Sequence, residues 1–187
     1  MSQLARGANV ALTREIPDLV TVVVGVTWDV GNEPVLAARL VCATLLLDGA
    51  SNLRTPEDFV FFNQLVSPDL SVGQRPEARG TDREQVEVDL ADVPSDVDTI
   101  LFVLYVDDGA GVHRTLGQLR SCRVRVLDLR GDRQLVTSED LAPGLRDETA
   151  LVLGELYRHS SGWKFRVVGQ GYSSGLTGVA GDHGLVL

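Results

Sequence analysis

Residues 121–129, SCRVRVLDL, decide the fold class because small or apolar side chains alternate there with charged ones. In an extended strand successive side chains point to opposite faces, so the cysteine and the valines would be buried while Arg123 and Arg125 face outward. Residues 85–90, QVEVDL, repeat the alternation, with Gln85 among the outward positions. The pattern predicts half-buried antiparallel strands.

Apolar and β-branched runs of this kind recur between turn signals along the chain. They cover residues 19–28, 39–47, 58–63, 85–90, 99–106, 121–129, 134–137, 149–158 and 163–170. Many short strands at such spacing are typical of an antiparallel sandwich, and no helical period is sustained long enough for a crossover helix. We therefore predict an all-β fold, a β-sandwich of two antiparallel sheets with a few short helical turns, for example near residues 115–119 and 176–180.

Glycine and aspartate clusters predict hairpin turns at residues 107–111, 130–132 and 159–162. The glycines of residues 169–175 have the spacing GxGxxxG, and too few residues follow for a dinucleotide-binding unit, so they predict a turn. Glu155 shares an otherwise apolar face with Leu151 and Leu153 and needs a partner if that face is buried.

Size and charge limit the classes of function. The 187 residues, 44% of them hydrophobic, suit one domain spanning residues 1–187. The formal net charge of -9 would repel phosphates, so nucleic acid is excluded as a partner. The longest apolar run, residues 19–28, is about half of what a membrane-spanning helix needs, which excludes membrane insertion. Residues 1–13 lack the features of a signal peptide, and we expect a cytoplasmic protein.

Residues with catalytic or metal-binding chemistry lack the spacing of known sites. Cys42 and Cys122 lie in apolar runs and are expected to be buried, inert thiols. The three histidines are far apart, and no GxSxG motif occurs. Trp28 and Trp163 begin or end apolar strands, which indicates core positions.

A series of ordered motifs resembles the TerD family. Residues 59–64, FVFFNQ, and 67–72, SPDLSV, are similar to the family's "FVFYNQ…SPDGSV" signature. Further similar segments are residues 7–10, 24–29, 88–90, 93–94, 148–150, 154–159 and 163–172. The resemblance implies a β-sandwich whose acidic loops bind Ca²⁺, in a family associated with tellurite resistance, phage defence and general stress.

The resemblance also implies a site, and the chain departs from the family there. The retained oxygen-bearing residues are expected to share one metal site, and they are Asp29, Asn63, Asp69, Asp82 and Glu84. The family's acidic "DLDAS" segment corresponds to residues 39–43, RLVCA, so both of its carboxylates are missing. Since Ca²⁺ needs about six to eight oxygen ligands, we expect calcium binding to be weak or lost. We further expect Arg39 to replace the metal charge by pairing with Asp29, Asp82 or Glu84.

The sequence favours a non-enzymatic binding or scaffold protein of a bacterial stress response, with protein partners from that system. Two alternatives stay open. One is a genuine Ca²⁺-binding member of the family, and the other is a hydrolase whose site is assembled only by the fold.

Overall fold

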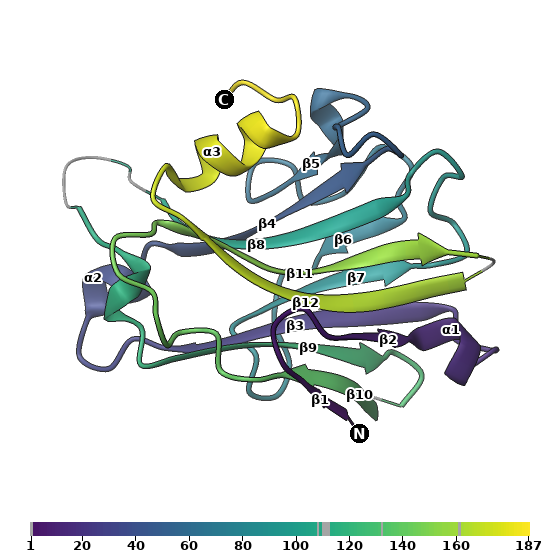
Figure 1. Cartoon of the computed structure of the whole chain (residues 1–187), viewed down its shortest axis with the longest axis horizontal. Helices are drawn as coiled ribbons and strands as arrows, with labels where there is room; N and C mark the ends of the chain where they lie inside the picture. Colours follow the sequence, from purple (N-terminus) through teal and green to yellow (C-terminus); the bar gives the residue numbers. More distant parts are fainter. Residues whose placement is uncertain (1, 108, 110–112, 132, 161) are drawn as a thin grey trace.

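Two six-stranded sheets face each other in the computed structural model, which describes residues 2–107, 109, 113–131, 133–160 and 162–187 (Figure 1). The first sheet contains, in spatial order, β1 (Ser2–Leu4), β10 (Arg133–Ser138), β9 (Ser121–Asp128), β3 (Thr21–Asp29), β7 (Glu84–Asp89) and β6 (Val72–Gln74). The second contains β2 (Asn9–Ala11), β12 (Gly162–Tyr172), β11 (Ala150–His159), β8 (Thr99–Val106), β4 (Leu40–Leu47) and β5 (Phe59–Val60). Neighbours run antiparallel except β1 and β10. The predicted sandwich is confirmed.

Helical structure is sparse. It consists of α1 (Leu12–Glu15), α2 (Pro34–Ala37), α3 (Gly175–Asp182) and the 3₁₀ turns η1 (Pro56–Asp58) and η2 (Leu116–Gln118). The turn η2 and the helix α3 lie where short helical turns were predicted. Among the described residues, no helix is both long and apolar enough to cross a membrane.

The main core lies between the sheets and follows the alternation of the sequence. In β9, Cys122, Val124 and Val126 are fully buried, whereas Arg123 and Arg125 remain partly exposed on the other face. Trp163 is buried in the same core, and its indole Nε1 donates to the carbonyl of Leu90 at 3.2 Å. Because apolar burial is the main favourable contribution to folding, this alternation on both sheets accounts for the sandwich.

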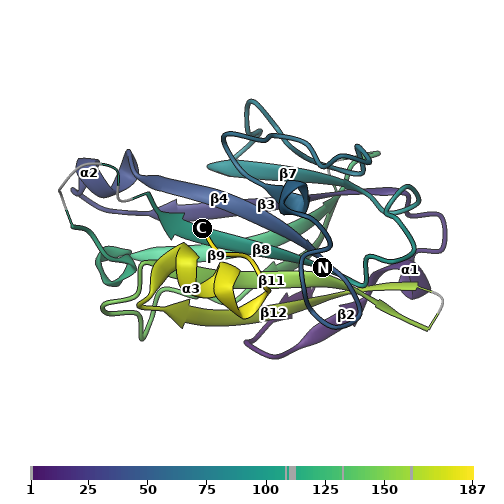
Figure 2. The ribbon, with the colours of Figure 1, turned by 90° about the horizontal axis from the view of Figure 1, so that it is seen from above.

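The second sheet is apolar on its outer face as well. A smaller cluster there includes Leu45, Leu101 and Tyr105, and α3 covers it through Val179 (Figure 2). A strand that is buried on both faces needs no polar alternation. This explains why β4 and β8 are almost continuous apolar runs, LVCATLLL and TILFVLYV.

Three local expectations were wrong. The register of β11 shifts between Val152 and Gly154, and this bulge separates Glu155 from the face of Leu153. Glu155 instead forms an ion pair with Arg166 of β12. Residues 107–111 do not form a hairpin, because β8 and β9 belong to different sheets; residues 108, 110 and 111 lie outside the described residues.

Gln85 is the third exception, since it is 1% exposed instead of facing solvent. Its side-chain nitrogen donates to Asp82 Oδ2 at 2.6 Å, and Arg125 Nε donates to Asp82 Oδ1 at 2.7 Å. The Asp82 side chain is fully buried in this group, over Gly25 of β3. A carboxylate is stable there only because two donors replace its water.

The Asp82 carboxylate lies so close to Gly25 that only a glycine fits there, so Gly25→Ala tests the contacts of Asp82 with Gln85 and Arg125. A Cβ at this position would lie 2.1 Å from Asp82 Oδ2, which displaces the carboxylate from Arg125. We expect a loss of about 3 kcal/mol in the free energy of unfolding, measured by urea denaturation, because a buried charge then loses its partner. The matched control is Gly181→Ala in α3, where a Cβ meets nothing within 4 Å and the effect should be within about 1 kcal/mol. Equal effects of the two substitutions would contradict the assignment.

Candidate functional site

The predicted ligands Asp82 and Glu84 lie on opposite faces of the first sheet. Gly25 and Gln85 are paired in register on the outer face, which is where the Asp82 carboxylate lies. Glu84 pairs with the buried Val26 and faces the second sheet. Only Arg83 separates them along the chain, but the sheet backbone stands between their carboxylates, so they cannot share one ion.

Glu84 connects the two sheets. Its Oε2 accepts hydrogen bonds from the backbone N–H of Cys42 at 3.0 Å and from Gln74 Nε2 at 2.6 Å. Burial raises the pKa of Glu84, and the hydrogen bonds from Cys42 and Gln74 only partly oppose this. Strand β5 pairs with β4 only at Thr44 and Leu45, so it does not reach Cys42. The Glu84 carboxylate accepts the Cys42 N–H at this position instead.

Asp29 and Asn63 lie apart from this pair. Asp29 ends β3, is exposed, and accepts from the N–H of Gly31 at 2.7 Å, which closes a local turn. Asn63 is exposed in the tight turn in which Phe61 and Gln64 exchange two backbone hydrogen bonds of 2.9 Å. Neither contact brings an oxygen toward Asp82 or Glu84.

Asp69 belongs to a different cluster, centred on Arg54. The Arg54 guanidinium binds Asp58 through two hydrogen bonds of 2.8 Å and Asp96 through one of 2.6 Å. Its Nη2 lies 3.5 Å from Asp69 Oδ2. Asp58 is 1% exposed, so its charge depends on this arginine. We call these four residues the Arg54 cluster.

Local donors fix the Asp69 side chain. Its Oδ1 accepts from the Ser67 hydroxyl at 3.1 Å, from the Ser71 N–H at 2.9 Å and from the Ser71 hydroxyl. Burial acts to raise the pKa of Asp69, but these hydrogen bonds outweigh it and the net shift is downward. Asp69 Oδ2 is buried and has no hydrogen-bond partner among the described residues. Its nearest counter-charge is Arg54, whose own pKa is raised by Asp58 and Asp96.

The five predicted ligands do not converge on one point. Within the described ranges, no group of three or more histidine, cysteine, aspartate or glutamate residues has the arrangement of a metal site. Arg39 also differs from expectation, because its Nη1 donates to the backbone carbonyl of Asp107 at 3.2 Å while Asp82 and Glu84 have other partners. The cation that contacts several carboxylates is Arg54, which sequence reasoning missed. The i,i+4 spacing of Arg54 and Asp58 was the available signal.

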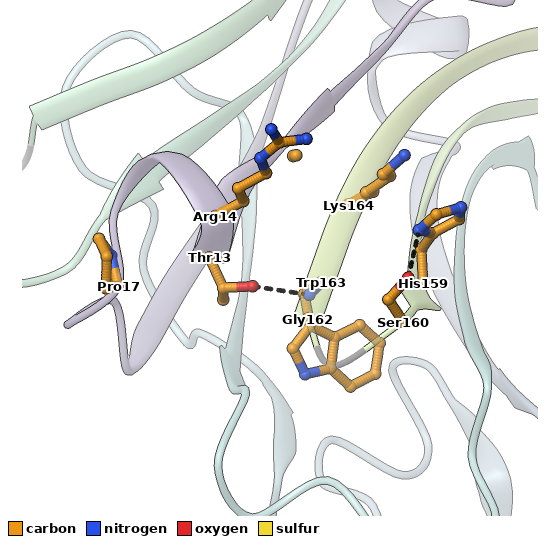
Figure 3. Close-up of a pocket in the computed structure, with 9 residues that line it drawn as sticks. Thr13, Arg14, Pro17, His159, Ser160, Gly162, Trp163 and Lys164 are labelled. Atoms are coloured by element: carbon orange, nitrogen blue, oxygen red, sulfur yellow. Dashed lines mark hydrogen bonds between the residues drawn. The ribbon is translucent and has the colours of Figure 1, made fainter.

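A basic hollow of about 400 Å³ lies between α1 and the β11–β12 hairpin (Figure 3). The charged ends of Arg14 and Lys164 point to the same side of it, and His159 lies beyond Lys164. The Thr13 hydroxyl accepts from the Trp163 N–H at 2.8 Å and fixes α1 against β12. None of the described lining residues is acidic, so by charge the hollow suits a small anion.

The same hollow bears on catalysis. Ser160 Oγ lies 3.3 Å from Nδ1 of its neighbour His159. An activated serine needs a histidine that is oriented by a third group, commonly a carboxylate. The described lining offers no carboxylate for that role, so the arrangement does not support a hydrolytic triad.

Both cysteines are buried in the main core, as expected. Burial, followed by the charge of Glu84, raises the pKa of Cys42. Burial and then Asp140 raise the pKa of Cys122 to about 12. Because the thiolate is the reactive form, both side chains are unreactive in the folded protein.

Comparison with known proteins places these features in a family. The TerD domain family matches residues 1–183. The chain belongs to the TerD family. It is 38% identical to general stress protein 16U of Bacillus subtilis (strain 168) over 187 residues, covering 97% of this chain and 96% of that protein. It is 36% identical to the tellurium resistance protein TerD of Serratia marcescens, with the same coverage of 97% and 96%.

A solved structure agrees on the fold of this TerD-family chain. The crystal structure of a homologue of the telluride resistance protein TerD from Streptomyces coelicolor A3(2) has a TM-score of 0.67 at 21% identity. The match covers 90% of this chain and 99% of that one. The resemblance found in the motifs thus extends over the whole sandwich.

The Arg54 cluster is tested by Arg54→Gln. The substitution leaves the buried Asp58 without its counter-charge, so we expect the free energy of unfolding to fall by about 3 kcal/mol in urea denaturation. The matched control is Arg130→Gln, which removes an exposed pair with Asp18 at 3.4 Å and should have an effect below about 1 kcal/mol. A loss no larger than that of the control would show that Arg54 is not needed.

The buried thiols give a second prediction. In the native protein at pH 8, Cys42 and Cys122 should resist alkylation by iodoacetamide, because their raised pKa values and burial leave almost no accessible thiolate. Both should react in denaturant, as counted by mass spectrometry. Rapid modification of either thiol without denaturant would contradict the core assignment.

Proposed function

We propose that this chain is a non-catalytic binding protein of a bacterial stress response of the tellurium-resistance type, acting in the cytoplasm, in which calcium binding is weak or lost. The names of the relatives support the biological role, since one is a general stress protein and another a tellurium resistance protein. Such a protein works by presenting surfaces on a rigid double sheet to protein partners of the same response.

One observation carries the calcium part of the proposal. The carboxylates that could bind an ion already have partners in the protein, above all in the Arg54 cluster, where one guanidinium is in contact with three aspartates. A calcium ion would have to displace these charge-assisted bonds and would still need about six oxygens. An arginine carries its charge permanently, so Arg54 offsets part of the negative charge of the cluster without metal.

A second candidate, a calcium-binding protein, is favoured by one atom. Asp69 Oδ2 is buried without a hydrogen bond, and an unsatisfied carboxylate oxygen is a good ligand for a cation. The two candidates differ in the counter-ion of Asp69. It is Arg54 in the non-catalytic binding protein and calcium in the calcium-binding protein.

Thermal unfolding with and without calcium separates the candidates. A ligand that binds only the folded state stabilises it by about 2.7 kcal/mol at one hundred times its Kd. We expect the melting temperature of the unaltered protein to be the same in EDTA and in millimolar calcium chloride. The variant with Arg39→Asp and Val41→Asp, which restores the two family carboxylates, should gain a calcium-dependent rise.

Calorimetric titration provides the second readout, and magnesium chloride the control for ionic strength. A calcium-specific rise in the melting temperature of the unaltered protein would overturn the proposal in favour of the second candidate. Failure of the double variant to gain calcium affinity would overturn the proposal that the lack of carboxylates at positions 39 and 41 weakens calcium binding.

A further inference from the structure

The connector between β5 and β6 carries an unusual concentration of exposed apolar side chains. It links the edge strand of the second sheet to the edge strand of the first. Six large hydrophobic residues of the described chain are exposed, and four of them lie in this connector. They are Phe62, Leu65, Val66 and Leu70, with exposed fractions of 48%, 45%, 42% and 77%. Together they form what we call the connector patch.

The backbone holds this patch in a defined shape. Phe62 occupies the tight turn closed by Phe61 and Gln64. The N–H of Gln74 donates to the carbonyl of Leu65 at 2.8 Å, and Val66 pairs with Gly73 as an extension of the first sheet. The exposed side chains therefore project from a fixed backbone, so little backbone conformational entropy is lost when a partner binds.

Leu70 is held in a conformation that leucine disfavours. Its φ is 65°, and among the described residues the other non-glycine residues with a positive φ are Ser51 and Ser160. The adjacent Asp69, fixed by the hydroxyls of Ser67 and Ser71 and by Arg54, maintains this turn. A strained backbone conformation that exposes a leucine does not stabilise the fold. Because the surrounding contacts nevertheless maintain it, the conformation points to a role in recognition.

An acidic surface borders Leu70. One hollow, which Leu70 itself lines, contains Glu87, Asp89 and Asp92 with Arg75 as the one basic residue of its described lining. The other lies over the Arg54 cluster, where three aspartates outnumber one arginine. The connector patch thus borders a surface of negative charge at Leu70.

The charge selects the kind of occupant. A second copy of this chain, with its own net charge of -9, would bring carboxylates against carboxylates. Phosphate-bearing surfaces such as anionic membranes are repelled for the same reason. A protein segment whose apolar side chains are flanked by Lys or Arg complements both the connector patch and the acidic surface beside it.

We propose that the connector patch docks a basic, apolar segment of a partner protein, with Leu70 as the central anchor. This rests on the proposed function as a binding protein and specifies its recognition surface. Phe62 and Leu65 extend the apolar contact, and the carboxylates of Glu87, Asp89 and Asp92 in the hollow lined by Leu70 bind the flanking cations.

The test uses a short synthetic peptide of leucine and arginine, labelled for fluorescence anisotropy, and the same peptide with glutamate in place of arginine. We expect the arginine peptide to bind and the glutamate peptide not to bind. Leu70→Gly should weaken binding about tenfold, the effect of losing one buried leucine. Phe62→Ser should weaken it as well, and the matched control Val186→Ser, which alters an exposed residue outside the patch, should leave it unchanged.

Stability separates this loss from misfolding. Leu70→Gly should not lower the melting temperature, because relief of the left-handed backbone offsets the freedom that glycine gives to the unfolded chain. Equal binding by all variants, or by both peptides, would overturn the proposal. Self-association in sedimentation velocity that Leu70→Gly abolishes would overturn it in favour of a second copy as occupant. None of these results alters the calcium experiment, so the docking proposal can fail while the proposed function stands.

Discussion

The Arg54 guanidinium holds together three segments that the chain brings to one edge of the sandwich. Asp58 belongs to η1 before β5, Asp69 to the connector before β6, and Asp96 to the segment before β8. Because Asp58 is almost fully buried, its charge cannot be left to solvent, and the guanidinium is the group that replaces water. The geometry of this edge, including the strained turn at Leu70, depends on the contacts of Arg54 with the three aspartates.

Carboxylates are satisfied by protein donors elsewhere in the molecule as well. Arg125 and Gln85 satisfy Asp82 on the outer face of the first sheet, and the Cys42 N–H and Gln74 satisfy Glu84 between the sheets. In each case a carboxylate of the family's loop signatures has become a structural acceptor. A chain of this kind keeps the shape of its loops through protein contacts.

Much of the fold could be predicted because period-two alternation is a direct consequence of strand geometry. The strand expected at residues 99–106 has those bounds as β8, and most others differ by one to three residues at an end. The strands β1, β2 and β6 were missed because three residues are too few to show a period. The bulge at Gly154 was missed for a related reason, since one inserted residue reverses the facing of Glu155 without altering the composition.

The site was less accessible to sequence reasoning. Motif similarity identified the carboxylates, but it could not show that positions as near in sequence as Asp82 and Glu84 lie on opposite sides of a sheet. It also directed attention to Arg39, whereas Arg54 gathers acids 4, 15 and 42 residues away along the chain. Such convergence depends on tertiary structure, which local spacing does not contain.

The most direct test of the central claim is a crystal structure of the protein grown in millimolar calcium chloride. The account predicts that the Arg54 guanidinium remains in contact with Asp58, Asp69 and Asp96 and that no calcium is bound among them. A fully occupied calcium ion on Asp69, with the Arg54 side chain displaced into solvent, would contradict it.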